Sequence, residues 1–177
     1  MKSSGLKKVE GGTALLEKIS LAIPGFRGYK KKEMRREGDR LVRDNIYRRL
    51  TGAKSGLREV FQILAKDKMT DDMRAADKLI AKFDRVSEMI NHAPHGFGGF
   101  FDAVKINEHD LERMMDFDLK LVESAKEVEA MVKQSKQEIQ GGKHENAGGY
   151  MGKITELMDR LESAFIERKE VIMGVEF

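Results

Sequence analysis

The sequence has no cysteine, only two prolines and few aromatic residues. The absence of cysteine excludes disulfide bonds, thiolate metal sites and cysteine nucleophiles together. Few prolines and aromatics, combined with 36% charged and 40% hydrophobic residues, are typical of long amphipathic helices rather than of a β-sandwich or a disordered tail. We therefore predict an all-α protein.

The chain also lacks a continuous apolar run of about 18 residues and a start that looks like a signal peptide. We therefore expect a soluble, cytoplasmic protein. A chain of about 150 residues buries roughly two thirds of its unfolded surface, so one domain with a substantial core is the default. Residues 1–12 are polar and glycine-rich, which predicts a flexible lead-in followed by a single helical domain over residues 13–177.

Apolar residues at helical spacing predict four main helices and a short amino-terminal one. Their expected spans are 13–23, about 29–68, 71–92, 107–140 and 150–174. The 107–140 helix alone would be about 50 Å long. Such lengths with narrow apolar seams predict an elongated antiparallel bundle built from coiled-coil hairpins. Gly52 and Gly56 interrupt the apolar seam of the 29–68 helix without shifting its phase, so any kink in that helix is expected between them.

The most unusual stretch is the basic run, residues 27–49, with ten Lys/Arg and four Asp/Glu. Clustered positive charge on one helix gives an anionic partner a surface to bind. Two plainer explanations stay open: a merely solvated face, and neutralisation by residues 107–177, which hold 16 Asp/Glu against 10 Lys/Arg. The candidate anion-binding residues are Arg27, Lys30, Lys31, Lys32, Arg35, Arg36, Arg40 and Arg43.

The function that these features favour is a non-enzymatic binding or scaffold module, with no catalytic residue and no cofactor. Its expected partner is an anionic macromolecule, with RNA or a ribonucleoprotein favoured over an acidic membrane surface or an acidic protein. The alternative is a membrane-surface or protein-assembly scaffold, in which the 13–23 helix meets acidic lipids or the apolar seams pair with another copy. A homo-oligomer is therefore a second open alternative.

A glycine-rich segment with three phenylalanines follows the predicted 71–92 helix. Glycines beside Phe97, Phe100 and Phe101 suit a partner-binding loop, because the flexible backbone presents rings that supply contact area. More often, such phenylalanines plug the end of a helical bundle, and this interpretation stays open beside the first. Both interpretations need the tight return between helices that the glycines allow.

Two further features of the sequence are candidates for a metal site and for a buried ion pair. His92, His95, Asp102 and His109 are the only grouped metal-ligand candidates, but they straddle a proline at a helix end and lack the spacing of a known site, so we predict no metal. Asp118 falls on the apolar seam of the 107–140 helix. We expect it to form a buried ion pair with an arginine of the basic run and so to fix the register of the helices.

Two segments together resemble an uncharacterised family of small all-helical proteins from bacteria and archaea. They are GYKKKEMRRE at residues 28–37 and GFGGFFDAVK at residues 96–105. The resemblance covers most of the chain, from about Pro24 to the last helix. It implies a helical fold in which the basic run and the Phe-rich loop belong together, and it implies no activity.

Overall fold

The computed structural model describes residues 3–28, 32–93 and 108–172. These residues form five α-helices and one short 3-10 helix, and no strand occurs among them. The helices are α1 (Ser3–Ala22), α2 (Lys32–Lys66), α3 (Thr70–Asn91), α5 (Glu108–Gln140), η1 (His144–Asn146) and α6 (Ala147–Ile172). The predicted all-α class is confirmed, and the four main helices lie within a few residues of their predicted spans.

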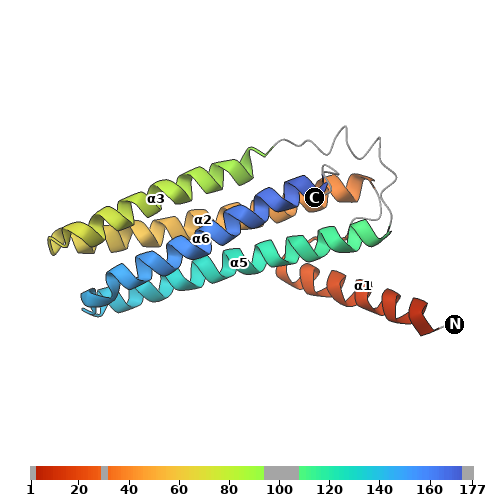
Figure 1. The fold of residues 1–177 in the computed structure, drawn as a ribbon, viewed down its shortest axis with the longest axis horizontal. Coiled ribbons are helices and arrows are strands. Elements are labelled where there is room, and N and C mark those ends of the chain that lie inside the picture. Colours follow the sequence, from red (N-terminus) through yellow and green to blue (C-terminus); the bar gives the residue numbers. More distant parts are fainter. Residues whose placement is uncertain (1–2, 29–31, 94–107, 173–177) are drawn as a thin grey trace.

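Helices α2, α3, α5 and α6 lie side by side along the long axis of the molecule (Figure 1). Helix α2 contacts α3 and α5, and α6 contacts the same two helices. The α2–α3 and α5–α6 connections lie at one end, called here the turn end (Figure 1). The other end, called here the open end, holds the start of α2, the finish of α3, the start of α5 and the finish of α6.

Helix α1 packs against α5, and its first turns extend away from the other helices (Figure 1). It begins at Ser3, so the structure differs from the flexible lead-in that we expected over residues 1–12. Extending an existing helix gains one hydrogen bond per residue, which allows a polar, glycine-containing segment to remain helical. Ile19 and Ile23 are 0% and 2% exposed, so the apolar face of α1 covers the core.

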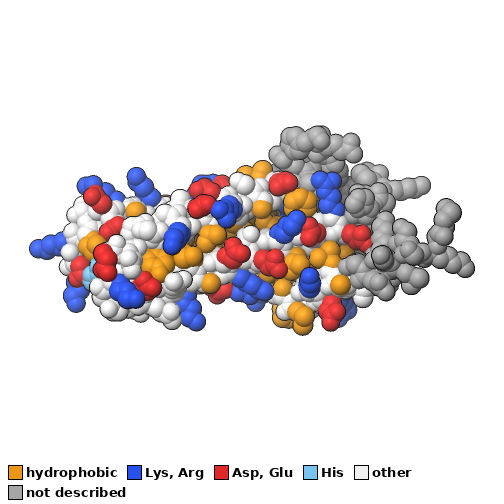
Figure 2. All heavy atoms as spheres, turned by 60° about the horizontal axis from the view of Figure 1, so that its bottom comes forward, with side chains coloured by type: hydrophobic (Ala, Val, Ile, Leu, Met, Phe, Trp, Pro, Cys, Tyr) orange, Lys and Arg blue, Asp and Glu red, His pale blue; other side chains and the backbone are white. Residues whose placement is uncertain are grey.

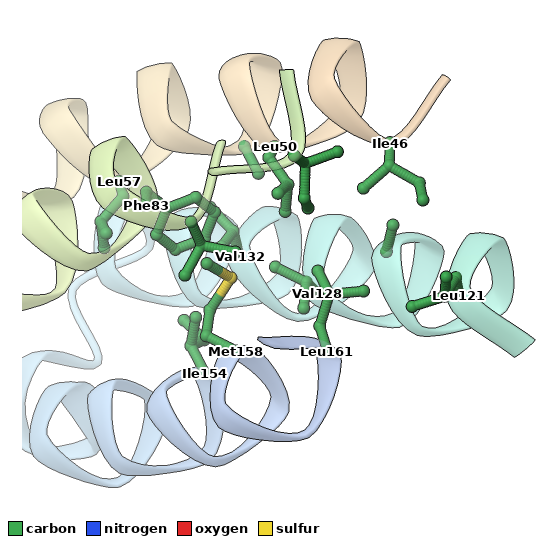
Figure 3. Packing of buried hydrophobic residues seen from close by; sticks show 14 of the residues in the cluster. Ile46, Leu50, Leu57, Phe83, Leu121, Val128, Val132, Ile154, Met158 and Leu161 are labelled. Atoms are coloured by element: carbon green, nitrogen blue, oxygen red, sulfur yellow. The ribbon is translucent and has the colours of Figure 1, made fainter. Parts of the chain in front are cut away.

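The core runs between the four main helices along their length. All six predicted seam residues of α2 are buried: Ile46, Leu50, Ala53, Leu57, Val60 and Leu64. Figure 3 shows how side chains from the other helices meet this seam, with Phe83 from α3, Val128 and Val132 from α5, and Met158 and Leu161 from α6. The 3, 4 spacing of apolar residues therefore identified the buried faces correctly.

The two glycines within α2 have different surroundings, and the helix continues through both. A methyl group added at Gly52 would meet nothing within 4 Å, whereas one added at Gly56 would lie 3.3 Å from Val132 Cγ1 of α5. Gly56 therefore marks a close approach of α2 to α5. None of the helices in the described ranges is both long and apolar enough to cross a bilayer.

Candidate functional site

The eight candidate anion-binding residues do not share one environment. Arg27, Arg36 and Arg40 are exposed, while Lys30 and Lys31 lie outside the described residues. Lys32 and Arg35 belong to α2, but their side chains are also outside the described part of the structure. Phe97, Phe100 and Phe101 of the predicted partner-binding loop, like His95 and Asp102, lie outside the described residues as well.

Arg43 is buried, so including it in an exposed docking face was wrong. It is 4% exposed, and its Nε donates to Asp39 Oδ2 at 3.0 Å. Its Nη1 donates to the backbone oxygens of Ala93 at 3.0 Å and Asn91 at 3.4 Å, at the end of α3. Arg43 lies three residues before Ile46, in phase with the apolar seam, which places it on the inner face of α2.

Arg43 belongs to a group called here the charge cluster: Asp39, Arg43, Asp118 and Arg168. Asp118 is 0% exposed and accepts a hydrogen bond from Arg168 Nε, and Arg168 Nη1 donates to Asp39 Oδ1 at 2.9 Å. The burial predicted for Asp118 is confirmed. The arginine hydrogen-bonded to it here is Arg168, which comes from α6 and not from the basic run.

The charge cluster is a balanced set of two carboxylates and two guanidinium groups. It joins α2, α5 and α6, and through Arg43 it also holds the end of α3. Buried charges are tolerated where they are paired, and each charged group of the cluster has a partner of opposite charge. A polar group that is buried at one defined place among apolar seams fixes how the helices align.

The exposed arginines that remain in the basic run lie just before α2 and along its first half. Within the part of the chain that the structure describes, Arg27, Arg40 and Arg48 make no ion pair. Arg48 donates from Nε to the backbone oxygen of Asp44 at 3.1 Å. Arg40 and Arg48 are eight residues apart, about 12 Å along the helix. Arg48 belongs to the basic run, but its position beside a groove could not be foreseen from sequence.

That groove, called here the α1/α2 groove, is an open hollow of about 530 Å³ beside Arg48. Its lining combines apolar side chains with polar and charged ones: Ile23, Pro24, Leu41, Asn45, Arg48, Arg49 and Glu129. Arg49 Nε donates to Asn45 Oδ1 at 3.0 Å, and Arg49 Nη1 donates to Glu129. The lining of the groove comes from the two residues that follow α1, from the first half of α2 and from α5.

Several other basic residues are neutralised by the acidic carboxyl-terminal helices, as one of the two plainer explanations predicted. Arg49 pairs with Glu129, Lys82 with Asp159, and Arg85 with Glu162. The hydrogen bond from Arg85 holds the pKa of the Glu162 carboxyl below its usual value. On the face drawn in Figure 2, basic and acidic side chains are interspersed along the molecule.

The histidines whose side chains are described each have a nearby partner. His92 Nε2 lies 2.8 Å from Glu88, while His144 lies 3.0 Å from both Asp67 and the backbone oxygen of Ile139. Over residues 3–28, 32–93 and 108–172, no three His, Asp or Glu side chains are grouped so that they could hold a metal ion.

Comparisons of the chain with protein families, with curated proteins and with solved structures found no match. The resemblance to an uncharacterised helical family therefore stays a prediction, and the functional argument depends on the geometry of the arginines and the groove.

Proposed function

We propose that this protein is a non-enzymatic binding or scaffold module that docks on RNA or a ribonucleoprotein through the exposed arginines just before α2 and along its first half. The observation that supports this is the exposure of Arg27, Arg40 and Arg48 without a carboxylate partner among the described residues. A guanidinium group offers two parallel donors to a phosphate, so these side chains suit a phosphate backbone.

The proposed scaffold is an elongated antiparallel bundle of two coiled-coil hairpins, α2–α3 and α5–α6. The contacts of α2 with α3 and of α5 with α6 support it, as does the core that all four helices share. A rigid helix holds arginines at fixed spacing, which reduces the entropy lost when they bind. The partner would be met in the cytoplasm.

The proposed binding should be dominated by phosphate contacts and should weaken steeply with salt. Neutralising about three phosphates of a single strand predicts a slope of about −2 in a plot of log affinity against log salt. The assay is fluorescence anisotropy with a labelled single-stranded RNA, titrated at several salt concentrations. Absence of binding at low salt would refute the proposal.

A charge-matched pair of variants makes the test specific to the surface. Arg40→Gln, which removes one positive charge, should reduce the affinity and flatten the salt slope. Arg74→Gln is the control, because Arg74 is exposed on the first turn of α3, at the turn end, and contacts Asp71 at 3.4 Å. Equal losses in both variants would mean that charge alone, and not this surface, drives binding.

The alternative function is a membrane-surface or protein-assembly scaffold. It is favoured by Leu21 of α1, which is 80% exposed on the side of that helix opposite its buried face. Burying one leucine side chain contributes about 1.5–3 kcal/mol, which is weak for anchoring on its own. Ile19 and Ile23 are buried and would not reach a membrane in this conformation. Flotation with anionic liposomes and light scattering test the lipid and self-assembly versions.

A further inference from the structure

We propose that the α1/α2 groove receives one unpaired nucleotide of a single-stranded RNA, with its base inside the groove and its phosphate on Arg48. The inference rests on the proposed function and makes it more specific. It states that the partner is recognised at an unstacked nucleotide and not only along a phosphate backbone.

The size and the walls of the groove fit a nucleotide. Its volume of about 530 Å³ lies within the ~300–1,000 Å³ of typical small-molecule sites. Three of its lining residues are apolar: Ile23, Pro24 and Leu41. A flat base has apolar faces that such side chains can contact, and single-stranded RNA can turn a base out of its stack to reach them.

Among the polar lining residues, Asn45 offers a hydrogen-bond donor and Glu129 an acceptor. Because Asn45 Oδ1 accepts the hydrogen bond from Arg49, the amide group of Asn45 is left with its Nδ2 hydrogens as donors. Glu129 uses Oε2 to accept from Arg49, and its Oε1 receives no hydrogen bond from the described residues. Arg49 thus holds both neighbours in place, and the exposed edge of a base presents donors and acceptors to match them.

Arg48 is the exposed arginine of the lining. Its Nε is held by the backbone oxygen of Asp44, and its two Nη atoms make no hydrogen bond with the described residues. Those two nitrogens suit the paired oxygens of a phosphate. A lipid chain in the same groove would offer no hydrogen bond to Asn45 Nδ2 or to Glu129 Oε1, which disfavours a purely apolar occupant.

The test compares a labelled single-stranded RNA with a duplex of the same sequence, using the full chain. We expect the single strand to bind at least fivefold more tightly, because a paired base cannot enter the groove. Asn45→Ala should weaken single-strand binding by about tenfold, the loss of one or two hydrogen bonds, and should leave duplex binding unchanged. The matched control is Gln62→Ala, which removes an exposed amide from α2 outside the groove.

The possible results separate nucleotide binding in the groove from RNA binding by the exposed arginines. Equal binding of single strand and duplex, unaffected by Asn45→Ala, would overturn the groove assignment and leave the arginine surface standing. No binding of either RNA would overturn both. Glu129→Gln is a second variant that keeps the groove and replaces its acceptor with an amide, so it should change the preference among homopolymer RNAs. Tighter binding of an acidic phosphopeptide than of RNA would also overturn the assignment.

Discussion

Removing the Asp118 carboxylate should destabilise the protein by about 3–5 kcal/mol, the usual effect of breaking a buried ion pair. The side chain is fully buried, and its hydrogen-bonded partner Arg168 is 4% exposed. In Asp118→Leu, two buried guanidinium groups face the single carboxylate of Asp39. These three remaining residues then carry a net positive charge at a buried place, which disfavours the folded state.

The size of this effect is measurable by ordinary unfolding experiments. For a chain of this length, each 1 kcal/mol lowers Tm by about 2–4 °C, so Tm should fall by about 6–20 °C. Urea unfolding followed by helical circular dichroism gives the free energy of unfolding directly. Unfolding midpoints should be compared at one protein concentration.

The double variant Asp118→Leu/Arg168→Met provides the decisive control. It removes one positive and one negative charge, so Asp39 and Arg43 remain as a balanced pair. Replacing both members of a buried ion pair with apolar residues is often neutral or stabilising, so the double variant should be more stable than Asp118→Leu alone. A loss below about 1 kcal/mol in Asp118→Leu, or a double variant whose loss equals the sum of the single losses, would refute the reasoning.

Three smaller effects should also be measurable. Gly52→Ala should stabilise the protein by about 0.5–1 kcal/mol in urea unfolding, whereas Gly56→Ala should gain less because its methyl group crowds α5; equal gains would contradict a close approach. Burial raises the pKa of Tyr150 above its ordinary 10.0, so an absorbance titration should show a late-ionising phenol that Tyr150→Phe removes. The stability that this raised pKa contributes should be lost as pH rises through the raised value. The hydrogen bond from Arg85 lowers the pKa of Glu162, so the pair should stabilise the fold at pH values above the unfolded-state pKa. This stabilisation, at most about 1 kcal/mol, should be lost as pH falls through the lowered pKa, and Glu162→Gln should abolish the change.

Helix positions were predictable because burial repeats with the period of the helix. The seam from Ile46 to Leu64 identified the inner face of α2 across two glycines, since apolar spacing carries phase information that a single poor helix former does not erase. The burial of Asp118 was predictable for the same reason. A charged residue in phase with an apolar seam lies on the buried face of its helix.

The identity of contacts between distant segments was not predictable. Pairing of Asp118 with Arg168 depends on which helix lies beside α5, and several helices carry suitable arginines. The groove depends on how Pro24 lies against α2, which no periodicity encodes. The burial of Arg43 was predictable, because Arg43 lies three residues before Ile46 and so falls on the apolar seam.

The charge cluster also has a consequence for how the molecule opens. Asp39 lies near the start of α2, Arg168 near the finish of α6, and the Arg43 bonds end at α3, so the cluster sits toward the open end, away from both short turns. Helix ends normally fray independently, with amide hydrogens exchanging on separate timescales. Here the last turn of α3 and the adjoining turns of α2 and α6 should exchange together, as one cooperative unit, and Asp118→Leu should split that unit into separately exchanging ends.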